Sequence, residues 1–234
     1  VERGAEIQAN RTLAVIRRMF NFALERDILE FSPCNAVKAP AKENIKDRVL
    51  SDEEIKALWN QLDECKSMDR RIALSLKLML ITGQRKIECL HLKYSEIDKS
   101  GWWTIPKEIS KNGKPHRVFL SKQAKEILSM AKEFPPNSDW VFPSPRTGKP
   151  FLGSSIDHAL REKKTKVIIK TDFTPHDLRR TASSVMTSMG IPRLTVSKIL
   201  NHSEAGVTAK HYDHYAYDKE KKVALTKRGK HDGD

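Results

Sequence analysis

Apolar residues recur at three- and four-residue steps over positions 7–24, which is the pattern of an amphipathic helix. The pattern predicts a helix that ends near Ile28–Leu29. Because an isolated helix cannot bury its apolar face, we expect the sequence to begin inside a domain that residues 1–37 complete. Residues 38–50, in a proline-containing stretch of mixed charge, are predicted to be a linker.

A second domain is predicted over residues 51–226. Ser51 and Glu54 form an S-x-x-E capping box, and apolar residues follow on one face of a helix. The next apolar run, over 72–81, is almost continuous, so this helix is expected at the centre of the core. It stops at Thr82–Gly83, and a short helix is predicted over 84–92.

The periodicity changes after these helices. Residues 102–106 and 116–120 have the character of strands, and the Asn-Gly pair between them is a strong hairpin signal. Further helices are predicted over 121–133, 153–167, 175–189, 192–200 and 205–216, followed by a frayed polar tail over 227–234. The fold class is therefore mainly α with a small antiparallel β-sheet (α+β).

Composition narrows the class of protein. The 234 residues carry a formal net charge of +13 and a pI near 9.6, so a polyanion is the first partner to consider. No apolar run approaches the length of a membrane span, which argues against a membrane protein. Three cysteines without C-x-x-C spacing argue against a disulfide scaffold or a zinc site and favour a reducing compartment.

Six polar residues together suggest a catalytic site, although each alone has an ordinary explanation: a surface charge for the arginines, Lys111 and His176, a helix cap for His202, and a core or rim position for Tyr212. They are Arg85, Lys111, His176, Arg179, His202 and Tyr212. The set suits a phosphate diester better than a divalent metal, because two guanidinium groups can bind non-bridging oxygens and stabilise a pentacoordinate transition state. A tyrosine hydroxyl can attack phosphorus, and lysine and histidine can move protons.

The order of these residues resembles the catalytic domain of tyrosine recombinases, in particular bacteriophage or genomic-island integrases. Residues 82–88 (TGQRKIE) resemble the T-G-x-R-x-x-E box, and residues 176–181 (HDLRRT) resemble the H-x-L-R-R-T box. Residues 200–202 (LNH) are similar to the L-G-H box, and Tyr212 follows ten residues later. Residues 6–35 also resemble the last helix of the core-binding domain, which in this family precedes the catalytic domain.

The resemblance implies a role for each position. Arg85 and Arg179 would be the two catalytic arginines, with Glu88 organising the pocket, and Lys111 would be the general acid for the 5′ oxygen. His176 and His202 would take the histidine positions, and Tyr212 would be the nucleophile. Lys114 remains a rival for Lys111, and Tyr215 and Tyr217 remain rivals for Tyr212. Asn201 replaces the family's glycine, and asparagine is expected to tolerate the left-handed backbone there.

The implied activity is site-specific DNA recombination through a 3′-phosphotyrosyl intermediate, for integration or excision of a mobile element, with no metal, cofactor or ATP. The implied partners are double-stranded DNA attachment sites and three further copies of the chain in a synaptic homotetramer. The resemblance is also compatible with a monomer in the absence of DNA, and with accessory DNA-bending proteins as further partners. The implied location is the bacterial cytoplasm, at the nucleoid. Two alternatives remain: a type IB topoisomerase-like relaxase, and a catalytically silent DNA-binding module. Residues 218–234 are a candidate for docking on a neighbouring protomer.

Overall fold

The computed structural model describes residues 4–42, 47–65, 68–134, 138–162, 173–202 and 215–231. The chain divides into two compact units, Val1–Lys46 and Asp47–Asp234. The division falls within the predicted linker over 38–50.

The first unit is built on helix α1 (Glu6–Leu24). The helix ends earlier than the sequence predicts, because Asp27 takes a left-handed backbone with φ of 53° and the Ile28 amide returns to the Ala23 carbonyl. After the turn the chain comes back along the helix, where the Asn10 side chain exchanges two hydrogen bonds with the Ala41 backbone. No residue of α1 is buried, so its apolar side chains are either exposed, as Val15 and Met19 are, or half-buried, as Leu13 and Phe20 are.

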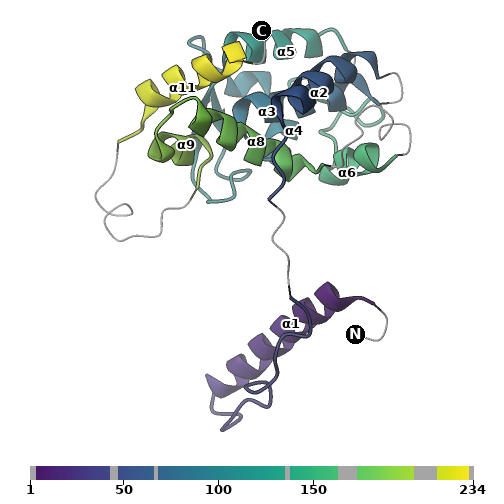
Figure 1. The fold of residues 1–234 in the computed structure, drawn as a ribbon, viewed down its shortest axis with the longest axis vertical. Helices are drawn as coiled ribbons and strands as arrows, with labels where there is room; N and C mark the ends of the chain where they lie inside the picture. Colours follow the sequence, from purple (N-terminus) through teal and green to yellow (C-terminus); the bar gives the residue numbers. More distant parts are fainter. Residues whose placement is uncertain are drawn as a thin grey trace. The chain divides into compact units, whose positions relative to one another are not determined.

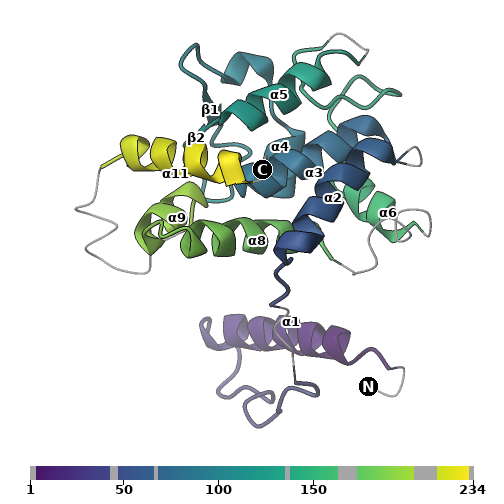
Figure 2. The same ribbon diagram turned by 45° about the horizontal axis from the view of Figure 1, so that its top comes forward.

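The second unit is mainly helical (Figures 1 and 2). Its elements in chain order are α2 (Asp52–Glu64), α3 (Arg70–Thr82), α4 (Lys86–Leu90), the 3-10 turn η1 (Tyr94–Glu96), β1 (Trp102–Ile105), β2 (His116–Phe119), α5 (Lys122–Ala131), α6 (Gly153–Arg161), α8 (Pro175–Ser188), α9 (Arg193–Ile199) and α11 (Asp218–His231). This confirms the predicted fold class. The predicted α2 capping box is also present, since the Glu54 amide donates to Ser51 Oγ and the Ser51 amide donates to Glu54 Oε2.

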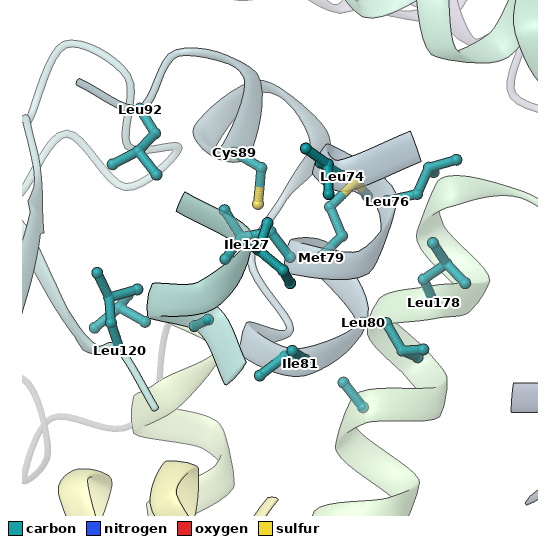
Figure 3. Close-up of a cluster of buried hydrophobic side chains, with 14 of the residues drawn as sticks. Leu74, Leu76, Met79, Leu80, Ile81, Cys89, Leu92, Leu120, Ile127 and Leu178 are labelled. Carbon is teal, nitrogen blue, oxygen red and sulfur yellow. The ribbon is translucent and has the colours of Figure 1, made fainter. Parts of the chain in front are cut away.

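Helix α3 is the centre of the core, as its hydrophobicity predicts. Every residue from Arg71 to Thr82 is buried, and the helix packs against α2, α4, α5, α8 and α11. Figure 3 shows the apolar side chains of α3 between Ile127 of α5 and Leu178 of α8. The helix therefore fixes where the chain that follows Thr82 must begin.

The predicted hairpin is confirmed as a two-stranded antiparallel sheet. Trp102 pairs with Phe119 and Ile105 pairs with His116. The hairpin loop, residues 106–115, contains a turn in which the Gly113 amide donates to the Ser110 carbonyl at 3.0 Å. Gly113 takes a φ of 65°, the conformation for which glycine suits this position.

Helix α11 shows that the predicted polar tail from Lys227 is wrong. The helix continues to His231, and Ala224 and Leu225 join the core. Arg228 is fully buried, with Nη2 3.4 Å from the Leu80 carbonyl. The helix packs on the chain's own α3, α5, α8, α9 and β2 (Figure 2), so part of the segment considered for docking on a neighbour contributes to its own domain.

Two predicted helices extend beyond the described residues. Helix α6 ends at Arg161, and positions 163–167 of the predicted helix over 153–167 lie outside the described ranges. Of the predicted helix over 205–216, residues 205–214 lie outside them, whereas 215 and 216 are described and are not helical. Across the described part of the chain, no helix has both the length and the apolar character that crossing a bilayer requires.

Candidate active site

The end of α3 sets the position of Arg85. Gly83 closes the helix with a φ of 67°, and a Cβ added there would lie 2.8 Å from Leu200 Cδ2 and 3.4 Å from Ala182 Cβ. Glycine is therefore required both by the backbone and by the close approach of α8 and the chain after α9. This turn brings Arg85 next to those elements.

Arg85 is oriented by a buried carboxylate. Its backbone amide donates to Glu88 Oε2 at 2.8 Å, and its Nη1 donates to Glu88 Oε1 at 3.0 Å. The Glu88 side chain is 1% exposed, whereas that of Arg85 is 24% exposed. Glu88 thus fixes one edge of the guanidinium from inside the core and leaves part of it accessible to a ligand.

Arg179 lies on α8 and is held from within the core. Its Nη1 donates to the Gly83 carbonyl at 2.7 Å, and its Nη2 donates to the Leu200 carbonyl. Burial, and then the neighbouring charge of Arg85, lower the pKa of Arg179 to about 10. The guanidinium is still charged at neutral pH, and the two arginines place two positive charges side by side.

Both arginines meet the same stretch of chain, residues 199–201, which we call the 199–201 turn. All three of its carbonyl groups accept side-chain hydrogen bonds. The Leu200 carbonyl binds Arg179, and the Asn201 carbonyl lies 3.4 Å from Arg85 Nη2. The Ile199 carbonyl accepts from Gln84 Nε2 at 3.0 Å and from His116 Nε2 at 2.9 Å. The turn therefore links α3, α8 and the hairpin.

His116 is a buried contributor that the sequence did not single out. Burial, followed by the charge of Lys221, lowers its pKa to about 4, so the imidazole is neutral at pH 7. A carbonyl oxygen can only accept, so Nε2 must carry the proton of this neutral ring. His116 thereby connects strand β2 to the 199–201 turn.

The hairpin loop reaches the same turn. Asn112 Nδ2 lies 2.9 Å from the Asn201 carbonyl and 3.1 Å from Asn201 Oδ1. Asn201 Nδ2 in turn donates to Ser110 Oγ at 3.0 Å. Lys111, between these two loop residues, is exposed, as is Lys114. The predicted general acid is therefore on a loop that is bonded to the residue preceding His202.

The two predicted histidines lie near the arginines. Partial burial lowers the pKa of His202, and the charges of Arg179, Arg85 and His176 lower it further. The pKa of His176, in the first turn of α8, is lowered by burial and by Arg180, Arg179 and Arg85. Asn201 has a φ of 50°, which confirms that asparagine takes the left-handed conformation before His202.

Tyr212 lies outside the described residues, so its role stays a prediction. The two rival tyrosines are described. Their rings pack edge to face with centroids 4.8 Å apart, and the Tyr215 hydroxyl donates to Glu220 Oε1 at 3.2 Å. Tyr217 has a φ of 56°, and Lys198 Nζ lies 4.9 Å from its ring centroid.

The surroundings of the site are polar. A hollow of about 570 Å³ opens between α8 and α9 beside His202, and several hydroxyl side chains line it. Among the described residues, no three histidine, cysteine, aspartate or glutamate side chains gather as a group that could hold a metal ion.

Sequence motifs located the charged groups but missed those that position them. Gln84, Asn112, His116 and Asn201 all act through side-chain contacts with chain far away in sequence. Gln84 occupies the variable position of the T-G-x-R-x-x-E box, Asn201 replaces the glycine of the L-G-H box, and Asn112 directly follows Lys111. For these three the position next to a candidate residue is the available signal, whereas His116 has no such signal in the sequence.

Two guanidinium groups, one carboxylate and two imidazoles on a helical domain with a β-hairpin define a class of proteins that act on phosphate diesters. A model of one such family, described as the phage integrase family, matches residues 48–219. This match covers more than half of the chain, and the chain belongs to that family.

Proteins with similar sequences support this family assignment. The chain is 25% identical over 223 residues to tyrosine recombinase XerC of Staphylococcus saprophyticus, with 92% of this chain and 73% of the relative covered. It is 27% identical over 207 residues to a putative integrase/recombinase, y4qK, of Sinorhizobium fredii, with 88% of this chain and 64% of the relative covered.

Solved structures share the fold. A lambda integrase dimer bound to a COC′ core site superposes with a TM-score of 0.70 at 18% identity, covering 92% of this chain and 77% of that chain. XerA recombinase superposes with a TM-score of 0.55 at 22% identity, covering 92% of this chain and 74% of that chain. The predicted fold is confirmed.

Family membership confirms the predicted activity. The chain is a tyrosine-type site-specific DNA recombinase, and the topoisomerase-like and catalytically silent alternatives are not favoured.

Proposed function

We propose that this recombinase uses Tyr212 as the nucleophile and binds the scissile phosphate between Arg85 and Arg179. The phenol oxygen forms a bond to phosphorus, the bond to the 5′ oxygen breaks, and a 3′-phosphotyrosyl link and a 5′ hydroxyl result. A 5′ hydroxyl from a second duplex then attacks that link and releases the phenol. Each step exchanges one phosphate ester for another, so no ATP is consumed.

The observation that carries this proposal is the arrangement of the two arginines. Arg179 is bonded to the Gly83 and Leu200 carbonyls, and Arg85 is bonded to Glu88. Positioned donors stabilise the charge of a pentacoordinate phosphorus without first having to reorganise. Only one carboxylate, that of Glu88, offsets the two guanidinium charges in these contacts, so a net positive charge remains for a phosphate.

Proton transfer is assigned to the remaining groups. The pKa values of His176 and His202 are lowered from the ordinary histidine value near 6.5, so both rings are neutral when the pH is above 6.5. Each neutral ring has one donor and one acceptor nitrogen. One of them can accept the phenol proton while the other donates to a phosphate oxygen. Lys111, as an ammonium on the hairpin loop, protonates the departing 5′ oxygen.

The proposed partner is double-stranded DNA carrying a recombination site, with four protomers in the synapse. One structural neighbour is a lambda integrase dimer on a core site, and another is a lambda integrase tetramer bound to a Holliday junction. The first unit is proposed to belong to a core-binding domain that contacts the same duplex. Accessory DNA-bending proteins and the bacterial nucleoid as location belong to the same proposal.

The test is covalent trapping. The chain is incubated with a library of nicked duplexes of randomised central sequence, so that cleavage releases a short fragment and traps the protein. The wild type should form a denaturation-resistant adduct with a free 5′ hydroxyl on the released fragment. Tyr212→Phe should bind DNA and trap nothing, and Tyr215→Phe, the matched control, should trap normally. An adduct formed by Tyr212→Phe would overturn the assignment.

A further inference from the structure

Asn112 and Asn201 join the hairpin loop to the arginine pocket through two side chains that touch no substrate in the proposed mechanism. Asn112 donates to both the carbonyl and the Oδ1 of Asn201, and Asn201 donates to Ser110 Oγ. The residues that exchange these bonds flank Lys111 on both sides in the loop. They are about 90 positions from Asn201 along the chain, with separations of 89 and 91.

The rest of the loop has much less support. Lys111, Gly113 and Lys114 are exposed, and a Cβ added at Gly113 would meet no atom within 4 Å. In contrast, Ser110 is only 6% exposed, and its amide donates to the Pro106 carbonyl at 3.0 Å. The contacts with Asn201 are therefore placed where the loop leaves the domain surface.

The residue at position 201 makes this connection possible. A left-handed backbone at this position needs glycine or asparagine, and asparagine alone adds an amide that can both donate and accept. The Asn201 carbonyl is also within 3.4 Å of Arg85 Nη2, and His202 follows directly. The hairpin loop is thus bonded to the same residue that contacts Arg85 and precedes His202.

We infer that Asn112 and Asn201 are positioning residues that hold the Lys111 loop at the arginine pocket before DNA binds. This inference rests on the proposed function, in which Lys111 is the general acid. Ordering a loop costs conformational entropy, and a loop already held in place does not incur that cost when the scissile phosphate arrives. Loss of either side chain should therefore impair the step that needs the lysine, more than DNA binding.

The test uses two substrates that differ in one atom. Both carry the duplex sequence recovered by covalent trapping, but in one the 5′ bridging oxygen is replaced by sulfur. Attack by the phenol on the sulfur substrate breaks the P–S bond and releases a thiolate, which leaves without a proton because thiols are far more acidic than alcohols. Protonation by Lys111 then becomes unnecessary, and its position no longer affects the rate.

The variants are Asn112→Ala and Asn201→Gly, with Asn60→Ala on the exposed face of α2 as the matched control. Glycine is chosen at 201 because it accepts the positive φ without strain. On the oxygen substrate, both variants should cleave about tenfold more slowly than wild type, as expected for a misplaced catalytic group. On the sulfur substrate, they should recover to within about twofold of wild type, and Asn60→Ala should match wild type on both.

The outcomes distinguish a failure of this inference from a failure of the proposed function. Wild-type rates for both variants on the oxygen substrate would overturn the inference, and so would a defect that persists on the sulfur substrate. Lys111→Ala is measured alongside: if sulfur does not rescue it, the proposed general acid is wrong, which is a failure of the proposed function instead. If sulfur rescues Lys111→Ala while the asparagine variants are unimpaired, only the positioning inference fails.

Hydrogen exchange supplies a readout that needs no DNA. The amides of residues 110–114 should exchange faster in Asn112→Ala and Asn201→Gly than in wild type, while those of α3 remain unchanged. Unchanged exchange in the loop would contradict the inference whatever the cleavage rates are.

Discussion

Arg179 and Lys111 both bring positive charge to the candidate site, but the first is built into the core and the second extends from an exposed loop. Arg179 is 4% exposed and donates to backbone carbonyls from two separate segments. Lys111 is exposed, and its neighbours Ser110 and Asn112 make the contacts that hold the loop. The arginine side is thus fixed by folding, and the lysine side depends on a few polar bonds.

This difference in burial fits the chemical role proposed for each residue. Stabilising the charge of a transition state requires donors that do not move, and burial provides that rigidity. Donating a proton to a leaving group requires a side chain that can reach the group as the bond breaks. The comparison therefore predicts that the two sides respond differently to substitution, in stability as well as in rate.

The largest effect is expected at the buried arginine. Arg179→Ala should slow cleavage by about 10³-fold, because it removes a fixed donor to the transition state. It should also lower the free energy of unfolding by about 1–3 kcal/mol, since the Gly83 and Leu200 carbonyls lose their donor. Single-turnover cleavage and denaturant unfolding measure the two effects. Arg180→Ala, which removes the ion pair with Asp177 and a charge near His176 but no donor to the turn carbonyls, is the comparison and should lose less than about tenfold.

The pH dependence of stability tests whether His116, at the base of the hairpin, is buried as a neutral imidazole. Its pKa is about 4 in the folded chain against an ordinary value of 6.5. The unfolded chain therefore binds a proton that the folded chain does not between these values, and stability falls as the pH is lowered from about 6.5 to about 4. The loss should be about 3 kcal/mol.

His116→Asn is the matched variant, because an amide can donate to the Ile199 carbonyl without titrating. Its free energy of unfolding should depend less steeply on pH over this window, by roughly the same 3 kcal/mol. The remaining histidines titrate in both proteins and cancel in the difference. Parallel pH profiles for the two proteins would show that His116 is not held neutral by burial.

Substitution of Lys111, unlike that of Arg179, should slow cleavage without lowering stability. Lys111→Ala should slow cleavage by about 100-fold through loss of the general acid. Its melting temperature should stay at the wild-type value, because the side chain is exposed. Lys114→Ala is measured beside it, and the lysine whose loss is rescued by the sulfur substrate is the acid. A large loss of stability in Lys111→Ala would contradict the division between the two sides.

The smallest effect is expected where α11 meets the hairpin. Arg117 of β2 forms an ion pair with Asp218, and both side chains are partly exposed, at 42% and 29%. Exposed pairs contribute little, so Asp218→Asn should shift the melting temperature by no more than about 3 °C. A larger shift, measured by calorimetry, would show that the hairpin is anchored by this pair as well as by Asn112 and Asn201.

The sequence correctly predicted the elements that carry a local signal, such as an apolar pattern, a helix cap or a turn. The continuous apolar run of α3, the capping box of α2 and the Asn-Gly turn each have a local physical cause that can be read without the fold. Helix α11 was not predicted at all, because its sequence is dominated by charged residues and shows no clear apolar face. Arg228 is nevertheless buried against the Leu80 carbonyl, a tertiary contact with no local signal.

The same reasoning explains what was foreseen of the candidate site. Arg85, Arg179, His176 and His202 stand in recognisable motifs, and the structure brings the two arginines close enough to His176 and His202 to lower the pKa values of both histidines. The convergence of both arginines on consecutive carbonyls of the 199–201 turn could not be foreseen, because backbone acceptors have no side-chain identity. The sequence predicts only that Asn201 tolerates the left-handed backbone of the turn, whereas its side chain also binds the hairpin loop.

The central claim is that this pocket delivers a DNA phosphate to Tyr212, and locating the nucleotide on the trapped protein tests it most directly. Nuclease treatment of the adduct leaves a short nucleotide on one tyrosine, and trypsin releases residues 211–219 as a single peptide that contains Tyr212, Tyr215 and Tyr217. Fragmentation by mass spectrometry distinguishes the three. The nucleotide mass on Tyr212 is the predicted result, and its presence on Tyr215 or Tyr217 would contradict the account.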